Sequence, residues 1–306
     1  MRSFAKSRSW KTYKSILNTE LGIHLEKEPF ESFVSIRGHN IRLDEWKPES
    51  QQLGTVILVH GAGGNGRILA PFAEPIASKG WRVLAPDLPG YGLSIPATGY
   101  RGDYSEWLEV IAELADKQES DVALVGYSMG GLSAALASHK SEKVKAVIAT
   151  TLLDLSNEET FVVAARTKLL GRLSLIGIKL VPWLFDRLRL PLSLITPLDS
   201  MSSNLKMQRY FVRDPLIGAS WKPAAFFRSV HQYKVSSLTL KCPLLLVHPG
   251  GDEWTPTALS LEVFNEIVAN KRFLELSNGS HLPLEKPAYK ELNEAVLNFL
   301  EKELAR

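Results

Sequence analysis

The sequence predicts an α/β fold in which a mainly parallel sheet is flanked by helices and carries an inserted helical cap. Three observations support this prediction. Short apolar runs alternate with segments of helical periodicity, which is the pattern of parallel strands joined by helical crossovers. The alternation stops over residues 152–235 and then resumes, as expected if the cap interrupts one domain. Glycine-rich loops follow some of the apolar runs, at the edge where open α/β sheets bind ligands.

The length and composition fit a single core domain with an insertion. The 306 residues are 45% hydrophobic and 23% charged, which is ordinary for a globular protein. A net charge of +3 and the lack of a nucleic-acid-binding motif argue against a nucleic-acid partner. The single cysteine, Cys242, excludes an internal disulfide and suits a reducing, cytoplasmic compartment. No apolar run reaches the roughly 20 residues of a membrane-spanning helix. We expect neither a metal nor a cofactor, and the oligomeric state stays open.

Residues 1–30 form a basic N-terminal extension. Apolar side chains at Trp10, Tyr13, Leu17 and Leu21 recur at roughly helical spacing. We predict a solvated, partly disordered terminus. A basic amphipathic helix that contacts a membrane or a partner, or an organellar transit peptide, remains an alternative. The basic residues, with no acid among them, are Arg2, Lys6, Arg8, Lys11 and Lys14.

The first part of the core, residues 31–151, alternates between strands and helices. A turn at 38–40 joins two antiparallel strands, and four further apolar runs indicate buried strands. Asp103 is the expected N-cap of one helix, with Glu106 three residues later completing a capping box. The expected strands are 33–36, 41–46, 55–60, 81–85, 122–125 and 145–150, and the expected helices are 68–79, 103–118 and 132–138.

The inserted segment, residues 152–235, is predicted to be a helical cap over the carboxyl ends of the strands. Its longest helix has apolar residues on one face and basic residues between them. We interpret the apolar stripe as packing within the cap, the alternative being a surface for an acyl chain or a membrane. The stripe consists of Leu169, Leu173, Ile176, Leu180 and Leu184. The core resumes over 236–306, with strands at 243–248 and 272–276 and helices at 257–269 and 287–304.

The stretch Gly126-Tyr127-Ser128-Met129-Gly130-Gly131 places a serine between a buried strand and a helix. Its glycines permit a turn so tight that larger side chains would collide with their neighbours. This turn would expose the Ser128 hydroxyl at the helix N-terminus, where unpaired N–H groups and the helix dipole stabilise an oxyanion. The pattern indicates a nucleophilic serine.

A second glycine-rich loop, residues 60–66, follows the buried strand 55–60. Neither G-K-[ST] nor G-x-G-x-x-G occurs in it, which argues against phosphate binding. Its glycines allow the backbone to approach a ligand closely, and one of its N–H groups can serve as a second donor to an oxyanion. We expect His60, at the end of the strand, to brace this loop.

A serine nucleophile needs a base, and the base needs an acid that fixes its tautomer. The chain order in this architecture is serine, acid, histidine. Asp252, in a glycine-rich turn directly after a strand, is favoured as the acid over Asp154, which lies where the cap begins. Of the seven histidines, only His281 lies in a loop after the last strand and downstream of both Ser128 and Asp252. We therefore expect His281 to be the base.

The chain resembles the α/β-hydrolase superfamily from about residue 33 to residue 304. Within it, His60-Gly61-Ala62-Gly63, the stretch 126–131 and Asp214-Pro215-Leu216 of the cap look like the monoacylglycerol lipase and lysophospholipase branch. Tyr127 departs from this pattern, because the branch commonly has histidine there. The resemblance implies an α/β-hydrolase fold with an eight-stranded, mainly parallel sheet.

The resemblance also implies roles for the site residues. Ser128 is the expected nucleophile, His281 the base and then the acid, and Asp252 the residue that orients it. Backbone N–H groups would form the oxyanion hole, and further residues would line the substrate site. The oxyanion donors are Ala62 and Met129, and the lining residues are Gly61, Gly63 and Tyr127.

The expected activity is hydrolysis of a carboxylic ester, either a small molecule or an acyl lipid. The cap or the basic N-terminus would supply a peripheral membrane contact. The alternatives are a thioesterase, a proline-specific peptidase, a carbon–carbon hydrolase, or a non-catalytic binding or scaffold protein of the same fold.

Overall fold

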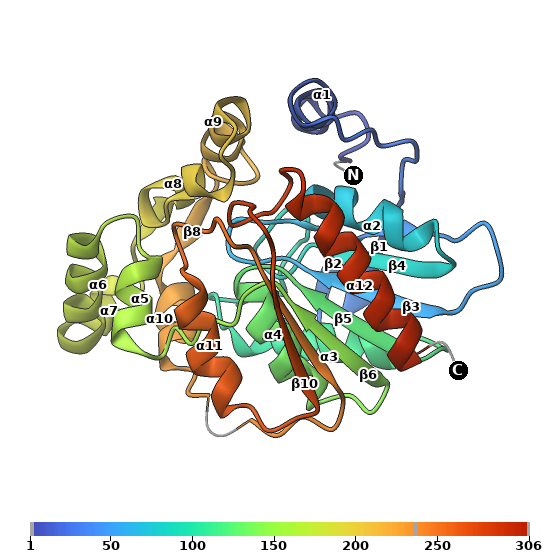
Figure 1. The fold of residues 1–306 in the computed structure, drawn as a ribbon. Coiled ribbons are helices and arrows are strands. Elements are labelled where there is room, and N and C mark those ends of the chain that lie inside the picture. The colour runs from blue at the N-terminus through green and yellow to red at the C-terminus, as the bar shows by residue number, and fades with distance from the viewer. Residues whose placement is uncertain (1–2, 236–237, 305–306) are drawn as a thin grey trace.

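One eight-stranded sheet forms the centre of the molecule, and the cap lies beyond the carboxyl ends of its strands (Figure 1). The computed structural model describes residues 3–235 and 238–304, so the expected start of the second core segment at 236 and both chain ends lie outside these ranges. The strand order is β1-β2-β4-β3-β5-β6-β9-β10. β2 pairs antiparallel with β1 and with β4, and the other neighbouring pairs are parallel. The predicted fold class and strand number are confirmed.

The central strands are buried on both faces. Every residue of β3 and β5 is buried, as their continuous apolar runs predict. Their carboxyl ends lie side by side in register, with Val59 opposite Gly126. The loops that follow these two strands, 60–66 and 127–128, therefore begin next to each other. The strands are β1 (Phe30–Ile36), β2 (His39–Trp46), β3 (Gly54–Val59), β4 (Trp81–Pro86), β5 (Val122–Gly126), β6 (Val144–Ala149), β9 (Leu244–His248) and β10 (Lys271–Glu275).

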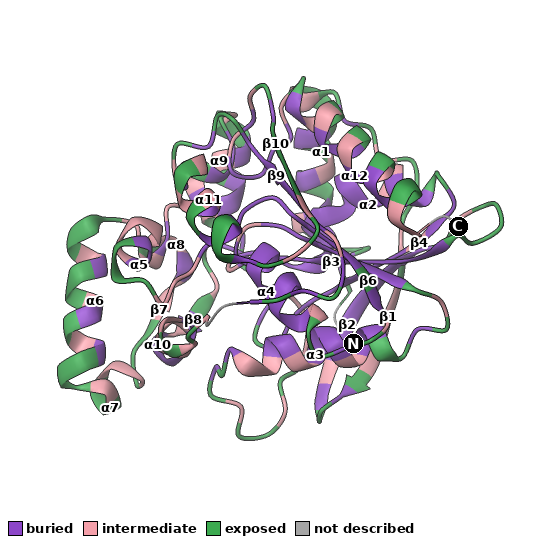
Figure 2. Cartoon of the chain, turned by 60° about the horizontal axis from the view of Figure 1, so that its bottom comes forward, coloured by how far each residue is buried: buried purple, intermediate pink, exposed green. Residues whose placement is uncertain are grey.

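Helices cover both faces of the sheet. α2 contacts α12 and α3 contacts α4, and Figure 2 shows the two pairs on opposite sides of the buried strands. Among the described residues, no helix combines the length and the apolarity needed to cross a bilayer. The helices of the core are α2 (Ala70–Ala77), α3 (Ser105–Asp116), α4 (Met129–Ser138), α11 (Thr257–Glu266) and α12 (Ala288–Leu304), with a short 3₁₀ turn, η1 (Gly66–Leu69), before α2.

The N-terminal segment is folded, so the prediction of a partly disordered terminus is wrong for its described residues. Helix α1 (Arg8–Leu21) begins where the Ser7 hydroxyl accepts a hydrogen bond from the N–H of Trp10, and it ends at Gly22 in the left-handed conformation, with φ 63°. Its apolar face is buried, and Tyr13 and Leu17 have no exposed surface. The amphipathic pattern therefore corresponds to packing against the protein itself.

Two groups of contacts hold α1. The Tyr13 hydroxyl donates to the carbonyl of Ile68 at 2.9 Å, which ties the helix to the core. The Tyr13 ring stacks on Tyr210 of the cap with 5.2 Å between centroids, and the Tyr210 hydroxyl lies 3.1 Å from that of Ser9. Figure 1 shows α1 beside cap helix α9 (Leu205–Arg213), although about 190 residues separate them in the chain.

Helix α3 begins one residue later than expected, with Tyr104 and not Asp103 at its N-cap. Asp103 precedes the helix and accepts from the N–H of Ser105 at 2.9 Å. Glu106 binds Arg37 at 3.1 Å and His39 at 3.4 Å. These partners draw the Glu106 carboxylate away from the helix start, so the predicted capping box does not form.

The cap consists of short helices and a small sheet that the sequence did not predict. Strands β7 (Arg189–Pro191) and β8 (Trp221–Pro223) pair antiparallel, and both end at a proline, which keeps them short. The helices are α5 (Glu158–Ala164), α6 (Lys168–Leu180), α7 (Pro182–Phe185), α8 (Leu192–Ile195), α9 and α10 (Ala224–Gln232), with a 3₁₀ turn, η2 (Leu198–Met201), between α8 and α9.

The leucine stripe of α6 faces outward, and its interpretation as packing within the cap is wrong. The buried residues of α6 are Gly171, Leu175 and Ile178, on the opposite face. A Cβ atom at Gly171 would lie 2.8 Å from the Cα of Val162, so glycine lets α6 pack closely on α5. This contact decides which face of the helix is covered, and the stripe is left at the surface.

Candidate active site

Ser128 lies on a strained turn between β5 and α4. Its φ of 56° and ψ of −135° are unusual for a residue with a side chain. The flanking glycines have no room for a side chain. A Cβ atom on Gly126 would lie 2.1 Å from the carbonyl oxygen of Gly130, and a Cβ atom on Gly130 would lie 2.2 Å from the carbonyl oxygen of Val59. The backbone N–H of Ser128 donates to the Thr150 hydroxyl at 3.2 Å. The turn therefore holds the Ser128 hydroxyl at the helix N-terminus.

The structure brings Ser128, His281 and Asp252 together in one hydrogen-bonded chain. Ser128 Oγ lies 2.6 Å from Nε2 of His281, and Nδ1 of His281 lies 2.7 Å from Oδ2 of Asp252. The carboxylate accepts a hydrogen bond from Nδ1–H, which leaves Nε2 free to accept from the serine hydroxyl. His281 and Asp252 are both buried, so the pair is shielded from water.

Asp252 is held as a carboxylate by its neighbours. Burial alone would raise its pKa, but the adjacent His281 and the hydrogen bonds from Thr255 together lower the pKa below its usual value. The Thr255 hydroxyl donates to Oδ2 at 2.6 Å, and the N–H groups of Trp254 and Thr255 donate to Oδ1 at 3.0 and 2.9 Å. Asp154, the other candidate acid, accepts instead from the N–H of Ser156 at the start of the cap.

The loop after β3 lies directly against the turn at Ser128. A Cβ atom at Gly61 would lie 2.8 Å from the Cβ of Ser128 and 3.1 Å from the N atom of Met129. This approach places the loop backbone at Gly61 next to Met129, the first residue of α4, whose N–H lies at the free end of the helix. The loop after β3 and the start of α4 therefore meet beside Ser128.

His60 braces this loop as a neutral imidazole. Its Nδ1–H donates to the Gly61 carbonyl at 2.8 Å, and its Nε2 accepts from the N–H of Leu88 at 3.0 Å. Complete burial lowers the pKa of His60 to about 4. Since both ring nitrogens are used in the neutral form, the ring fixes the loop without carrying charge near the site.

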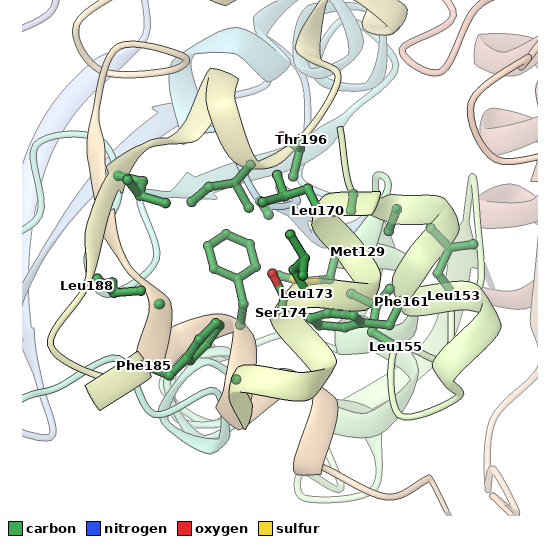
Figure 3. Close-up of a pocket in the computed structure, with 18 of the residues that line it drawn as sticks. Met129, Leu153, Leu155, Phe161, Leu170, Leu173, Ser174, Phe185, Leu188 and Thr196 are labelled. Carbon is green, nitrogen blue, oxygen red and sulfur yellow. The ribbon is translucent and has the colours of Figure 1, made fainter. Parts of the chain in front are cut away.

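A large apolar cavity of about 320 Å³ is lined in part by Ser128, and Figure 3 shows the side chains around it. Leu153, Leu155 and Phe161 line one side in this view, and Phe185 and Leu188 lie on the other. All of these residues belong to the cap or to the segment that enters it. The cavity is therefore suited to an extended hydrocarbon chain whose end reaches the serine.

A second cavity, of about 20 Å³, is lined by Ser128, by His281 and by the loop after β3. Tyr127 lines it, with its ring stacked on Phe72 at 4.7 Å between centroids. Gly61 lines it too, whereas Gly63 lines neither of these two cavities. Gly63 has a φ of 95° and lies against Leu192 and Leu198 of the cap, so its freedom serves the turn of the loop.

Sequence reasoning missed two residues that adjoin the triad. Trp254 lines both cavities, and its ring centroid lies 4.4 Å from that of His281. Thr255 holds the Asp252 carboxylate as described above. The sequence signal that could have identified Trp254 and Thr255 is their position two and three residues after the predicted acid. The lining residues of the cap gave no comparable signal, because apolar residues occur throughout that segment. Among the described residues, no group of three or more His, Cys, Asp or Glu side chains could hold a metal ion.

The comparison with protein families agrees with this geometry. The family described as alpha/beta hydrolase fold matches residues 54–288, which is more than half of the chain. The chain belongs to the α/β-hydrolase fold family.

Individual α/β-hydrolases similar to this chain include enzymes of lipid ester cleavage. The monoacylglycerol lipase of Mycolicibacterium smegmatis is 24% identical over 259 residues, covering 81% of this chain and 88% of the lipase. The phospholipase YtpA of Bacillus subtilis is 22% identical over 274 residues, covering 83% of this chain and 97% of the phospholipase. The expected resemblance to the monoacylglycerol lipase and lysophospholipase branch is confirmed, and this similarity supports an ester hydrolase.

Solved structures of the same fold include two lipases. The monoacylglycerol lipase of Paleococcus ferrophilus superposes with a TM-score of 0.67 and 22% identity, covering 86% of this chain and 99% of the lipase. A soluble variant of the monoglyceride lipase of Saccharomyces cerevisiae, in complex with a substrate analogue, gives a TM-score of 0.72 and 16% identity, covering 92% of this chain and 98% of the lipase. At these identities the superpositions establish the fold.

Proposed function

We propose that this α/β-hydrolase is a serine hydrolase that cleaves carboxylic esters of acyl lipids through a covalent acyl-serine intermediate. The observation that carries the proposal is the hydrogen-bonded chain of Ser128, His281 and Asp252, with distances of 2.6 and 2.7 Å, beside an apolar cavity that Ser128 lines. A buried base beside a strained serine is the arrangement that activates a hydroxyl.

In the first half of the reaction, Nε2 of His281 removes the hydroxyl proton while Ser128 Oγ bonds to the ester carbonyl carbon. The carbonyl oxygen becomes an oxyanion between the N–H groups of Ala62 and Met129. The intermediate then collapses, the bond to the leaving oxygen breaks, and protonated His281 gives its proton to that oxygen. Asp252 stabilises the imidazolium and stays ionised.

In the second half, a water molecule replaces the alcohol. Its proton passes to His281 as its oxygen attacks the acyl-serine carbonyl, and the second tetrahedral intermediate releases the fatty acid. His281 returns the proton to Ser128 Oγ, so the enzyme is regenerated without any redox change.

The position of His281 indicates which cavity holds the alcohol part of the ester and which holds the acyl part. Because His281 protonates the leaving oxygen, the leaving group must lie on the His281 side, next to the cavity of about 20 Å³. A space of this size holds about one water molecule. The acyl chain then occupies the cavity of about 320 Å³. We infer that turnover falls as the alcohol of the ester grows, from methyl through glyceryl to glycerophosphocholine.

The test is hydrolysis by the wild-type protein and by Ser128→Ala of a series of esters with one acyl chain and a growing alcohol, from methyl to glyceryl to glycerophosphocholine. We expect wild-type turnover that falls along the series and none for the variant. Retention of most activity by Ser128→Ala would refute the nucleophile. If neither protein turns over any ester while a fluorophosphonate still labels Ser128, thioesters, aminoacyl amides and carbon–carbon substrates test the alternative hydrolases. Absence of labelling would favour a non-catalytic binding protein.

We propose, as expected from the sequence, a cytoplasmic protein that reaches its lipid substrate through peripheral contact with a membrane. The buried single cysteine, Cys242, is compatible with a reducing compartment.

A further inference from the structure

The large and the small cavity adjoin each other, because three residues line both of them. These residues are Ala62, Ser128 and Trp254. Ala62 and Ser128 have small side chains. Among the described residues, Trp254 is therefore the only one with a large side chain that lines both cavities. Its ring forms part of the boundary between the space for the acyl chain and the space for the alcohol.

The Trp254 ring also lies against the base of the triad. Its centroid is 4.4 Å from that of the His281 ring, and the two ring planes are inclined by 47°. In the proposed reaction, His281 gives its proton to the oxygen of the departing alcohol. That oxygen must approach Nε2 of His281, so the first carbon atoms of the alcohol come close to Trp254.

The other walls of the small cavity belong to the closely packed core. Five large side chains line the cavity and are each at most 6% exposed, and they are Ile68, Leu69, Tyr127, Met201 and Leu282. Side chains packed at the density of a protein interior cannot move aside for a larger ligand. Trp254 is only half-buried, so the core does not enclose its ring on all sides. The bulk of this ring therefore sets how much room the alcohol has.

The backbone of Trp254 is held by the acid of the triad. Its N–H donates to Oδ1 of Asp252 at 3.0 Å, and the N–H of Thr255 donates to the same oxygen at 2.9 Å. The indole N–H of Trp254 has no hydrogen-bond partner among the described residues. The side chain can therefore be replaced without removing a hydrogen bond from Asp252 or His281, and the residue keeps its place beside them.

We propose that Trp254 is a specificity-determining residue, whose ring excludes bulky alcohols from the space beside His281. This inference rests on the proposed esterase function. The selectivity comes from a steric clash with the larger alcohol and not from a new attraction to the smaller one. Reducing the ring should therefore admit larger alcohols.

The experiment compares Trp254→Phe and Trp254→Ala with the wild-type protein. The two variants enlarge the space beside His281 in two steps. The matched control is Phe185→Ala, which removes an aromatic ring that lines the large cavity but not the small one. The value of kcat/KM is measured for esters of one acyl chain with methanol, glycerol and glycerophosphocholine, and for methyl esters of growing acyl length. The melting temperature of each variant shows whether it is folded.

The informative quantity is the ratio of kcat/KM for the methyl ester to that for the glycerophosphocholine ester. We expect this alcohol ratio to fall from wild type to Trp254→Phe to Trp254→Ala, by about tenfold or more for Trp254→Ala. A general loss of activity from the missing contact with His281 cancels in the ratio, because it affects all esters alike. Phe185→Ala should change the dependence on acyl length and leave the alcohol ratio as in wild type.

Three results would overturn the proposal. One is an alcohol ratio that neither Trp254 variant changes, and another is a wild-type protein that cleaves the three esters equally fast. The third is an equal fall of the ratio in Phe185→Ala, since the large cavity would then control the alcohol. If Trp254→Ala does not fold, the ratio for Trp254→Phe decides.

The same measurements separate this proposal from the proposed function. A wild-type protein that hydrolyses no ester would refute the esterase function and the role of Trp254 together. Hydrolysis of the esters with an unchanged alcohol ratio would refute the role of Trp254 alone.

Discussion

Replacing His60 by asparagine tests how the loop after β3 is held. The amide introduced by His60→Asn can still donate a hydrogen bond to the Gly61 carbonyl, but it cannot titrate. In the wild type, burial lowers the pKa of His60 from 6.5 to about 4. Between these two pH values the unfolded chain binds a proton that the folded chain does not. The free energy of unfolding must therefore rise with pH in this window and fall as the solution is acidified.

The magnitude follows from the size of the pKa shift. One pKa unit corresponds to about 1.4 kcal/mol, so the full contribution of His60 is about 3 kcal/mol, fully lost only below pH 4. Between pH 7.5 and pH 5, the wild type should lose about 2 kcal/mol from this residue alone. His60→Asn should lack this loss, although it is less stable at pH 7.5 because the hydrogen bond from the N–H of Leu88 is missing.

Urea unfolding of both proteins at pH 7.5, 6 and 5 measures this effect. Other groups titrate in the same range, but their contributions are common to both proteins and cancel in the difference. The stability difference between wild type and His60→Asn should shrink by about 2 kcal/mol on going from pH 7.5 to pH 5. A difference that does not change with pH would show that His60 carries a proton in the folded state, and the neutral bracing role would be refuted.

Three further predictions concern the site and the cap. Asp252→Asn should lower kcat for a p-nitrophenyl ester by about 10⁴-fold, and wild-type activity would transfer the acid role to Asp154. Gly130→Ala should lower the free energy of unfolding by about 3 kcal/mol or more, since its Cβ would lie 2.2 Å from a carbonyl oxygen of β3. The control Gly99→Ala has open space around it and should lower the free energy of unfolding by only about 1 kcal/mol, because of its positive φ. Equal decreases in melting temperature for the two variants would contradict this. Burial lowers the pKa of Lys222 from 10.5 to about 7, so wild-type stability should rise from pH 7 to pH 9.5, while Lys222→Met should lack this rise in melting experiments.

The triad residues could be predicted because their signals are local. The glycines that permit the turn at Ser128 lie within three residues of it in the sequence. Asp252 and His281 each follow a strand at the carboxyl edge of the sheet. The parallel sheet then brings these loops together without any further information. For the same reason the fold class could be predicted, since alternating strands and helices leave few arrangements for the chain.

Features that depend on distant contacts could not be predicted. The helical spacing of Trp10, Tyr13 and Leu17 indicates an apolar face, but it does not say that Tyr210 covers it. Periodicity likewise cannot tell which side of α6 is buried, because both sides carry leucine or isoleucine. The close approach permitted by Gly171 decides this, and it becomes apparent only once α5 is in place.

The position of α1 bears on how the cap can move. Through Tyr13, α1 joins Ile68 of the core to Tyr210 of α9, so the later part of the cap is fixed to the core at one end. A second attachment of the cap to the core is the hydrogen bond that Lys222 of β8 donates to the Gly90 carbonyl at 2.7 Å. The contacts of α6, by contrast, are mainly with α5 and α7. Asp186, directly after α7, is bound by Arg228 of α10 at 2.6 Å, so the α5–α7 unit is held through the later part of the cap, which α1 and Lys222 attach to the core.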